Sequence, residues 1–390
     1  MSRASDDHCV SSAQIINAPR LPVKTHGVPE GAQLCSYCLV VAPGRIIREN
    51  ETNVGSNQGE VTVGQSNGRA NAALLAETPA QDGRPGAVFR SAGDRFLLVE
   101  FGPMELDLTL NFRVLGLNQA LRDAGIGGVI ETIPALRSIL IHYDSTQLRP
   151  SDLIAEVDRH YASLPPVEDL TIPSREISLP LAVNDQWTRA DIAKYVQFIR
   201  KDAPNIRNGN NIDYAAEYNG LRDAEEFLEY LMATPWWNAA NGFFPGLPFM
   251  FPLDPRYAVV IPKYNPTRPW TPEGAVGIAG PCLAIYPVPS PGGYQLIGRT
   301  IPIYDAQQRN PAFKENPILM KPGDRVSFTR VNDDELIALR ERVYDGSYEY
   351  QIAEGELNVG EYLARLEEIK PETEAFKRRQ QAAAERTPVP

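Results

Sequence analysis

Prolines and glycines recur every few residues between positions 241 and 300, and this spacing constrains the fold more than any other feature of the chain. Prolines and glycines at this spacing exclude a long helix, because proline lacks the backbone N–H that a helix interior needs. Short runs that favour strands lie between the turn residues. These runs are YAVVI (257–261), VGI (276–278), LAIY (283–286) and YQLIG (294–298). The sequence therefore predicts a compact β-barrel in this stretch.

The composition narrows the class of protein. With 390 residues, the chain is long enough for about two or three domains. The formal net charge is -11 and no basic tract exceeds the cluster at 377–379, so nucleic-acid binding is not expected as a main role. The start lacks a signal-peptide core, no window is apolar enough to span a membrane, and the few cysteines fit a reducing compartment. We therefore expect a soluble, cytoplasmic protein with no membrane partner.

Strands and helices alternate in the region before the barrel. The leucines and valine at 110, 114, 117 and 121 recur at helical spacing with Gly125 as the stop, and a second helix is expected to open at Ser151. The strand candidates are RFLLVEFG (95–102), GGVIETI (127–133), RSILIHYD (137–144) and SREISLPLAV (174–183). The order β-α-β-β-α-β predicts a ferredoxin-like split βαβ unit with both helices on one face of its sheet.

The whole chain is expected to have an α+β fold with five regions. Capping-box patterns at Thr188 with Asp191 and at Asn332 with Glu335 predict helices on either side of the barrel. The regions are an irregular N-terminal arm (1–86), a ferredoxin-like α/β domain (87–183), a helical insert (184–240), the β-barrel core (241–330) and a helical tail (331–390).

Several common catalytic motifs are absent from the sequence. There is no phosphate-binding loop of the G-x-x-x-x-G-K-[ST] type, no G-x-S-x-G elbow, and no histidine pair at zinc-binding spacing. Cys35 and Cys38 form a C-x-x-C pair without a second pair, and we interpret them as local packing residues. The sequence therefore predicts no metal and no cofactor.

Motifs in a specific order carry a family resemblance. They are GDRFLLVEFG (93–102), SILIHYD (138–144), GFFPGLPFM (242–250), EGAVGIAG (273–280), IYPVPSPGGYQLIGRT (285–300) and KPGDRVSF (321–328). They resemble the allophanate-hydrolase subunit 1 family, which includes a 5-oxoprolinase subunit and one half of the carboxyltransferase domain of urea carboxylase. The resemblance covers about residues 88–330 and implies an α/β unit followed by a cyclophilin-like β-barrel, with the substrate pocket at the barrel.

The motifs mix two branches of that family. GFFPGLPFM resembles the free-standing oxoprolinase type, whereas KYNPTRPWTPEGAVG (263–277) is more similar to urea carboxylase. In urea carboxylase a second family half precedes this region and a biotin carrier domain follows, and neither is visible here. The resemblance therefore implies a carboxyltransferase half that is repurposed, works with a separate partner half, or forms a homo-oligomer. The apolar loop at 242–244, where urea carboxylases carry an acidic residue, favours a larger and more hydrophobic substrate than urea.

Chemistry at an amide or ureido carbon needs stabilisation of an oxygen and transfer of a proton. The catalytic candidates are Lys263, Tyr294 and Arg299, and Gln295 is expected to share one face of a strand with Arg299. The substrate-binding candidates are Phe243, Phe244, Gly246, Phe249, Tyr264, Asn265, Arg268, Gly292, Gly293, Gln295 and His142. The alternatives are that the glycines only form barrel turns, that the Lys263 region is a solvated loop, and that His142 lies on a partly solvated sheet face.

Two classes of function fit these features. The first is an enzyme that acts on a small molecule at an amide, lactam or ureido carbonyl, as a hydrolase or in the manner of a carboxyltransferase. The alternative is a non-catalytic binding or regulatory module, like the kinase-inhibiting branch of the family, or a partner subunit of a larger carboxylase or oxoprolinase complex.

Overall fold

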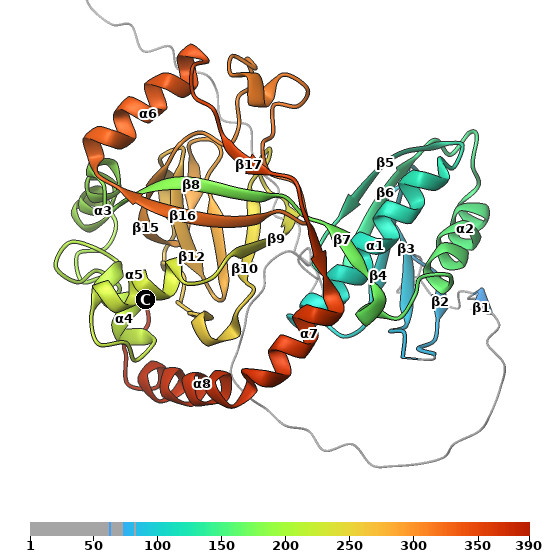
Figure 1. Cartoon of the computed structure of the whole chain (residues 1–390), viewed down its shortest axis with the longest axis horizontal. Helices are drawn as coiled ribbons and strands as arrows, with labels where there is room; N and C mark the ends of the chain where they lie inside the picture. Colours follow the sequence, from blue (N-terminus) through green and yellow to red (C-terminus); the bar gives the residue numbers. More distant parts are fainter. Residues whose placement is uncertain (1–61, 64–72, 82) are drawn as a thin grey trace, which may run out of the picture. The chain divides into compact units, whose positions relative to one another are not determined.

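The computed structural model describes residues 62–63, 73–81 and 83–390 (Figure 1). Most of the expected arm at 1–86, including Cys35 and Cys38, therefore lies outside the described residues. Over the described ranges, no helix is both long enough and apolar enough to cross a membrane.

A six-stranded antiparallel sheet forms the first part of the described chain, in the order β1-β2-β3-β4-β6-β5. Its strands are β1 (Thr62–Val63), β2 (Leu74–Thr78), β3 (Ala87–Ser91), β4 (Phe96–Phe101), β5 (Val129–Pro134) and β6 (Ser138–Tyr143). Alternate strand residues such as Val99 and Ile141 are fully buried against helices α1 (Leu108–Ala124) and α2 (Pro150–Ala162) (Figure 1). Both helices therefore cover one face of the sheet, as the sequence predicts.

The ends of these helices test the predicted start and stop signals. Helix α1 ends at Gly125, whose φ of +56° suits glycine, so the predicted stop is confirmed. Helix α2 begins at Pro150 after Arg149 rather than opening at Ser151. Proline is tolerated in the first turn because no intrahelical bond uses its nitrogen.

The strand expected to complete the ferredoxin-like unit belongs to the barrel instead. This strand, β8 (Glu176–Val183), pairs in parallel with β16 (Arg325–Val331) and antiparallel with β17 (Gln351–Ala353). The position beside β4 is filled by β3, which forms a tight hairpin with it. Consecutive residues of β8 are buried, so both of its faces need cover, and the barrel provides it.

Seven strands close into a barrel in the order β15-β12-β13-β10-β9-β16-β8, and pairing of β15 with β8 completes the ring (Figure 1). The other barrel strands are β9 (Trp236–Asn241), β10 (Pro248–Pro252), β12 (Ala275–Ala279), β13 (Cys282–Ile285) and β15 (Gln295–Thr300). The predicted α+β fold, with an α/β unit followed by a closed β-barrel, is confirmed. Trp236 and Trp237 in β9 are both buried, so they are core residues rather than the wall of an open pocket.

The run YAVVI does not form the predicted strand. It follows a 3-10 turn, η3 (Pro255–Tyr257), and only Ile261 makes an isolated bridge, to Gly280. The side chain of Asn219 takes the place of a neighbouring strand. Its Oδ1 accepts from the Val260 N–H at 2.8 Å, and its Nδ2 donates to the Val260 carbonyl at 3.1 Å.

Barrel closure depends on a glycine in β15. A Cβ added at Gly298 would lie 2.1 Å from the backbone oxygen of Ala182 on β8. We expect Gly298→Ala to lower the free energy of unfolding by about 1–3 kcal/mol, because a strand backbone must move. Chemical denaturation followed by circular dichroism measures this change. Gly127→Ala is the matched control, since no heavy atom lies within 4 Å of its added Cβ. Equal free energies of unfolding for the two variants would show that β15 can move away from β8 without loss of stability.

Three helices form the predicted insert, namely α3 (Gln186–Phe198), α4 (Ile212–Tyr218) and α5 (Ala224–Met232). The predicted capping box of Thr188 and Asp191 is wrong. Helix α3 begins earlier, at Gln186, and its N-cap is Asp185. The Asp185 carboxylate accepts from the Trp187 N–H at 2.9 Å and from the Thr188 hydroxyl. Asp191 is therefore not used as a cap.

The tail contains α6 (Asp333–Asp345), β17, β18 (Glu356–Asn358), α7 (Val359–Glu368) and α8 (Lys370–Ala384). The capping box of Asn332 and Glu335 at α6 is confirmed. The two short strands were not predicted, and β18 pairs with β7 (Thr171–Pro173).

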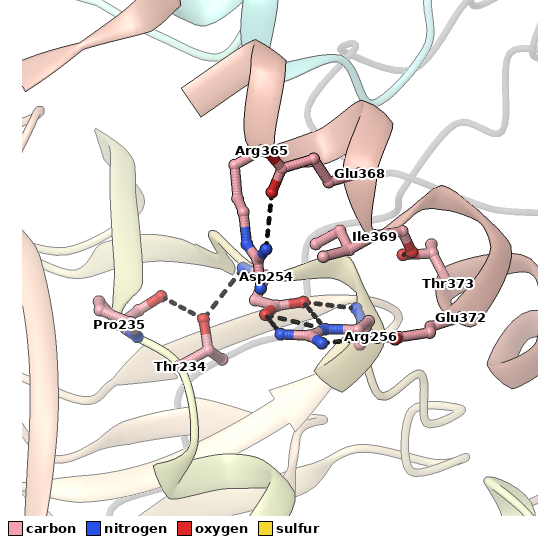
Figure 2. Close-up of polar contacts among 9 residues, drawn as sticks. All are labelled: Thr234, Pro235, Asp254, Arg256, Arg365, Glu368, Ile369, Glu372 and Thr373. Atoms are coloured by element: carbon pink, nitrogen blue, oxygen red, sulfur yellow. Dashed lines mark hydrogen bonds and ion pairs between the residues drawn. The ribbon is translucent and has the colours of Figure 1, made fainter. Parts of the chain in front are cut away.

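A polar cluster fastens the tail to the barrel loop at η3 (Figure 2). The Arg256 guanidinium donates to Asp254 at 2.6 Å and to Glu372 of α8 at 2.6 Å. The Asp254 N–H donates to the Thr234 hydroxyl at 3.0 Å, which anchors the loop beside β9. Arg256 thus links the loop to α8, as does Gln380, which donates to the Ala258 carbonyl at 2.9 Å.

We expect Arg256→Leu to loosen the first turn of α8. The cluster is partly exposed, so its loss costs at most about 1 kcal/mol, equivalent to roughly fivefold faster amide exchange there. Hydrogen–deuterium exchange of peptides from 370–384 measures the effect. Arg378→Leu is the control, because its exposed pair with Glu374 stays within α8. Unchanged exchange in Arg256→Leu would show that other contacts hold the helix.

Candidate functional site

Several of the site candidates come together near the Gly-rich turn at 292–294. Here β11 (Arg268–Thr271) pairs with β14 (Ser290–Gly292). The Tyr264 N–H donates to the Gly293 carbonyl at 2.7 Å, which joins the two segments beyond the strands. The residues gathered here are Lys263, Tyr264, Arg268, Gly292, Gly293, Tyr294 and Gln295.

Arg268 is fully buried at the centre of this group. Its Nε lies 3.1 Å from Asp191 Oδ2, its Nη1 donates to the Tyr294 carbonyl at 2.6 Å, and its Nη2 donates to the Thr271 hydroxyl at 3.2 Å. The guanidinium also lies 4.6 Å from the centroid of the Tyr264 ring. Arg268 therefore holds the turn at 292–294 through its hydrogen bond to the Tyr294 carbonyl.

Asp191 is the site residue that sequence reasoning missed. Burial raises the pKa of its carboxyl to about 6, although Arg268 and Lys194 both favour the charged form. Asp191 lies on the buried side of α3. An acidic residue at a buried helical position is rare, and this pattern could have identified Asp191 from the sequence.

Tyrosines pack around the turn. Tyr286 and Tyr294 meet edge to face at 6.3 Å between ring centroids. A Cβ on Gly292 would lie 2.2 Å from the Tyr286 hydroxyl, so glycine allows this close approach. Burial, followed by the neighbouring Cys282 and then Tyr286, strongly raises the pKa of Tyr294. Tyr294 therefore stays protonated, so it can donate a hydrogen bond but is a poor source of a transferred proton.

Lys263 is the exposed cation of the group. Its Nζ lies 5.8 Å from the centroid of the Tyr294 ring, next to the Gly-rich turn. The neighbouring Asn265 is exposed, and its carbonyl accepts from Arg200 at 2.7 Å. The segment 263–265 is thus partly solvated, while hydrogen bonds to Gly293 and Arg200 hold its backbone.

Arg299 lies in a different environment from Gln295, and the expectation of a shared face is wrong. Strand β12 pairs Gly277 with Leu296 and Val276 with Gly298, so Ile297 is an extra residue in β15. Such a bulge shifts the alternation of side chains along the strand. Gln295 donates to the Pro262 carbonyl at 2.8 Å and accepts from Asn205.

The acidic partner of Arg299 is Glu273. The Arg299 Nε donates to the Glu273 carbonyl at 2.7 Å, and its Nη2 lies 3.4 Å from the Glu273 carboxylate. Arg340 of α6 pairs with the same carboxylate. The Arg299 guanidinium also lies 4.5 Å from the centroid of the Trp187 ring. Burial first, and then the positive charge of Arg340, lowers the pKa of Arg299.

The apolar loop between β9 and β10 contains the remaining barrel candidates. Phe243 is 67% exposed, with φ of +60°, and its ring lies 5.7 Å from that of Phe249. Phe244 is half-buried, and a Cβ on Gly246 would meet Ile318 at 2.7 Å. Phe249 and Tyr294 pack against one buried cluster that includes Trp237 and Cys282. This cluster connects the loop with the turn at 292–294.

His142 does not join the group at the barrel. It lies on β6, on the sheet face opposite Ile141 and Tyr143, and stacks on Phe96 at 4.5 Å between ring centroids. This arrangement fits the partly solvated sheet position that the sequence favoured.

Two pockets lie beside these groups. The first, of 210 Å³, is lined by Asp191, Lys194, Tyr195, Phe198, Ile199, Arg268, Pro269 and Trp270. The second, of 380 Å³, is lined by Glu273, Pro287, Val288, Pro289, Tyr304, Asp305, Ala306, Gln307, Arg309 and Tyr344. Within the described ranges, no group of three or more His, Cys, Asp or Glu side chains is arranged to hold a metal ion.

The comparisons with known proteins agree with this architecture. The family model described as carboxyltransferase domain, subdomain C and D, matches residues 87–314, which is more than half of the chain. The chain belongs to this family. It is a carboxyltransferase-like domain related to urea carboxylase and to a 5-oxoprolinase subunit.

Relatives of two kinds support this assignment. The chain is 35% identical over 292 residues to the urea amidolyase of Saccharomyces cerevisiae, covering 75% of this chain and 16% of that protein. It is 27% identical over 261 residues to a 5-oxoprolinase subunit of Bacillus subtilis, covering 64% of this chain and 95% of that subunit. Against the crystal structure of the Kluyveromyces lactis urea carboxylase, the TM-score is 0.69 at 31% identity, covering 80% of this chain and 28% of that chain. The chain therefore spans only a fraction of the urea-processing relatives.

Proposed function

We propose that the chain acts at the carbonyl group of an amide, lactam or ureido compound, as one half of a carboxyltransferase-type site. One observation carries the proposal: the exposed Lys263 ammonium lies beside a Gly-rich turn that buried Arg268 holds. A cation beside this turn is suited to stabilise a developing oxygen charge.

The proposed roles follow from these positions. Lys263 contacts the carbonyl oxygen of a compound that lies beside the turn at 292–293. The protonated Tyr294 is available to donate a hydrogen bond, without transfer of its proton. Arg268 positions the turn, and Arg299, held by Glu273, lies outside this set.

The names of the relatives narrow the compound class. Urea carboxylase and 5-oxoprolinase are named for a urea and a cyclic amide, and both compounds contain a carbonyl bonded to nitrogen. The exposed Phe243 and its neighbour Phe249 favour a compound with an apolar body. We therefore propose a hydrophobic lactam or ureido compound.

A second candidate is a partner subunit of a larger complex. The observation that favours it is the coverage of 95% of a protein named as a subunit, that of the Bacillus subtilis 5-oxoprolinase. In that case a second family half, or a second copy of this chain, completes the site.

The test is conversion of a defined panel. The full chain, alone and together with the proteins encoded beside it, is incubated with 5-oxoproline, urea, N-alkyl ureas and alkyl-substituted lactams, and products are followed by mass spectrometry. We expect conversion of an alkyl-substituted compound in preference to urea. A folded chain that converts none of the panel in any combination, while the Bacillus subtilis oxoprolinase assayed in parallel converts its own substrate, would contradict the proposal.

A further inference from the structure

The 210 Å³ pocket lined by residues of α3 and β11 has walls that are unusual for a protein surface. Phe198 is 71% exposed, and Ile199 and Trp270 are each 42% exposed, all on the same pocket. Apolar side chains scattered singly over a surface need no explanation, but a group of them around a cavity indicates a binding surface.

Two opposite charges face this pocket without meeting each other. Asp191 and Lys194 are three residues apart on α3 and therefore lie on one face of the helix. Among the described residues, no ion pair joins them, and Lys194 has no acidic partner within 4.0 Å. The Lys194 Nζ lies instead 5.4 Å from the centroid of the Trp270 ring. Both charges therefore line the pocket without pairing with each other.

The pocket floor is a fixed carboxylate. Asp191 Oδ2 faces the buried Arg268 Nε at 3.1 Å, and no described residue donates a hydrogen bond to Oδ1. Arg268 donates to Tyr294 and Thr271, and its Nε faces the Asp191 carboxylate. The Oδ1 atom of Asp191 therefore remains as an acceptor.

We propose that this pocket binds a small zwitterion of the α-amino-acid type with an apolar side chain. Its ammonium meets the Asp191 carboxylate, its carboxylate meets Lys194, and its side chain lies among Phe198, Ile199 and Trp270. The volume of 210 Å³ is below the range of drug-sized sites, which suits a ligand of this size.

Singly charged ligands fit this arrangement less well. A plain amine would leave Lys194 unpaired beside Trp270, and a plain carboxylate would meet the negative Asp191. An ammonium gains further from the aromatic ring of Tyr195 in the wall. A zwitterion satisfies both charges at once.

The charge on Asp191 adds a pH dependence. The groups that face it are Arg268 from β11, Lys194 and Tyr195 from α3, and Tyr264. With a pKa of about 6, the carboxyl is ionised at pH 7.5 and becomes protonated as the pH falls below 6. The ammonium and the carboxylate of an amino acid keep their charges over this interval. Affinity is therefore expected to fall on acidification from pH 7.5 to 5.5.

The test is calorimetric titration of the full chain with L-leucine, N-acetyl-L-leucine and L-leucine methyl ester. We expect leucine to bind about tenfold or more tightly than either derivative, because each derivative loses one charge. Lys194→Met is expected to bring the affinities for leucine and the methyl ester to within about twofold of each other. Lys377→Met on α8 is the matched control and keeps the discrimination.

Two results decide the proposal: the relative affinities of the three compounds, and whether the apolar side chains of the pocket are accessible in solution. Lys194 pairs with no buried group, so its variant tests the site without the folding defect expected from Asp191→Asn. A flat leucine titration, equal affinities for all three compounds, or unchanged discrimination in Lys194→Met would overturn it. A stable dimer in sedimentation that covers Phe198 and Trp270 and leaves leucine unbound would assign the apolar walls to a second copy instead.

Discussion

Arg268→Met should lower the free energy of unfolding by about 3–5 kcal/mol at pH 7.5, because it leaves the buried Asp191 carboxylate without its partner. The variant also loses the bond that holds the Tyr294 carbonyl. Guanidinium denaturation followed by tryptophan fluorescence measures the loss.

The stability lost in Arg268→Met is expected to depend on pH. The pKa of Asp191 in the folded chain is about 6, above its usual 3.8. Folding therefore makes the carboxyl easier to protonate than it is in the unfolded chain. Without Arg268 the pKa rises further, and a neutral carboxyl costs less to bury. The deficit of Arg268→Met should therefore be smaller at pH 5 than at pH 7.5.

A double variant provides the control for this prediction. Asp191→Leu combined with Arg268→Met removes both charges, and stability should recover to within about 1–2 kcal/mol of the wild type. A loss below about 1 kcal/mol in the single variant at pH 7.5 would show that the pair does not anchor the turn.

Lys263→Met should lower kcat/KM for a converted compound at least about 100-fold, because it removes the cation assigned to the reacting oxygen. Stability should stay within about 0.5 kcal/mol of the wild type, since Lys263 is exposed. Steady-state kinetics and thermal denaturation measure the two quantities separately.

The matched control for Lys263→Met is Lys314→Met. Lys314 is also exposed, but it lies at the end of η4 (Pro311–Phe313) and away from the gathered candidates. Its rate should equal that of the wild type. Similar rates for Lys263→Met and Lys314→Met would remove Lys263 from the proposed chemistry.

Local signals predicted much of the fold. Turn prolines and glycines delimit β12, β13 and β15, and Gly125 ends α1, because these residues act on their own backbone. The position of β8 was not predictable from local pattern, since its partners β15, β16 and β17 come much later in the chain. The boundaries of the five expected regions stay a prediction.

The candidate site was predictable only in part. The neighbourhood of Lys263, Tyr264 and Arg268 with the turn at 292–294 follows from two adjacent segments that pair as strands. The partner of Arg268 does not, because Asp191 reaches it from α3 and only the packed helix brings the two charges together. The bulge at Ile297 likewise depends on the register between β12 and β15, so alternation alone misplaced Arg299.

The most direct test of the account is the isotope-edited infrared spectrum of a bound lactam or ureido compound carrying ¹³C at its carbonyl. In the wild-type chain, contact with Lys263 should shift the carbonyl stretch to lower frequency relative to water, because a cation at the oxygen weakens the double bond. In Lys263→Met the band should return toward its value in solution. The same shift in both proteins, at equal occupancy of the bound compound, would contradict the claim that Lys263 polarises the carbonyl.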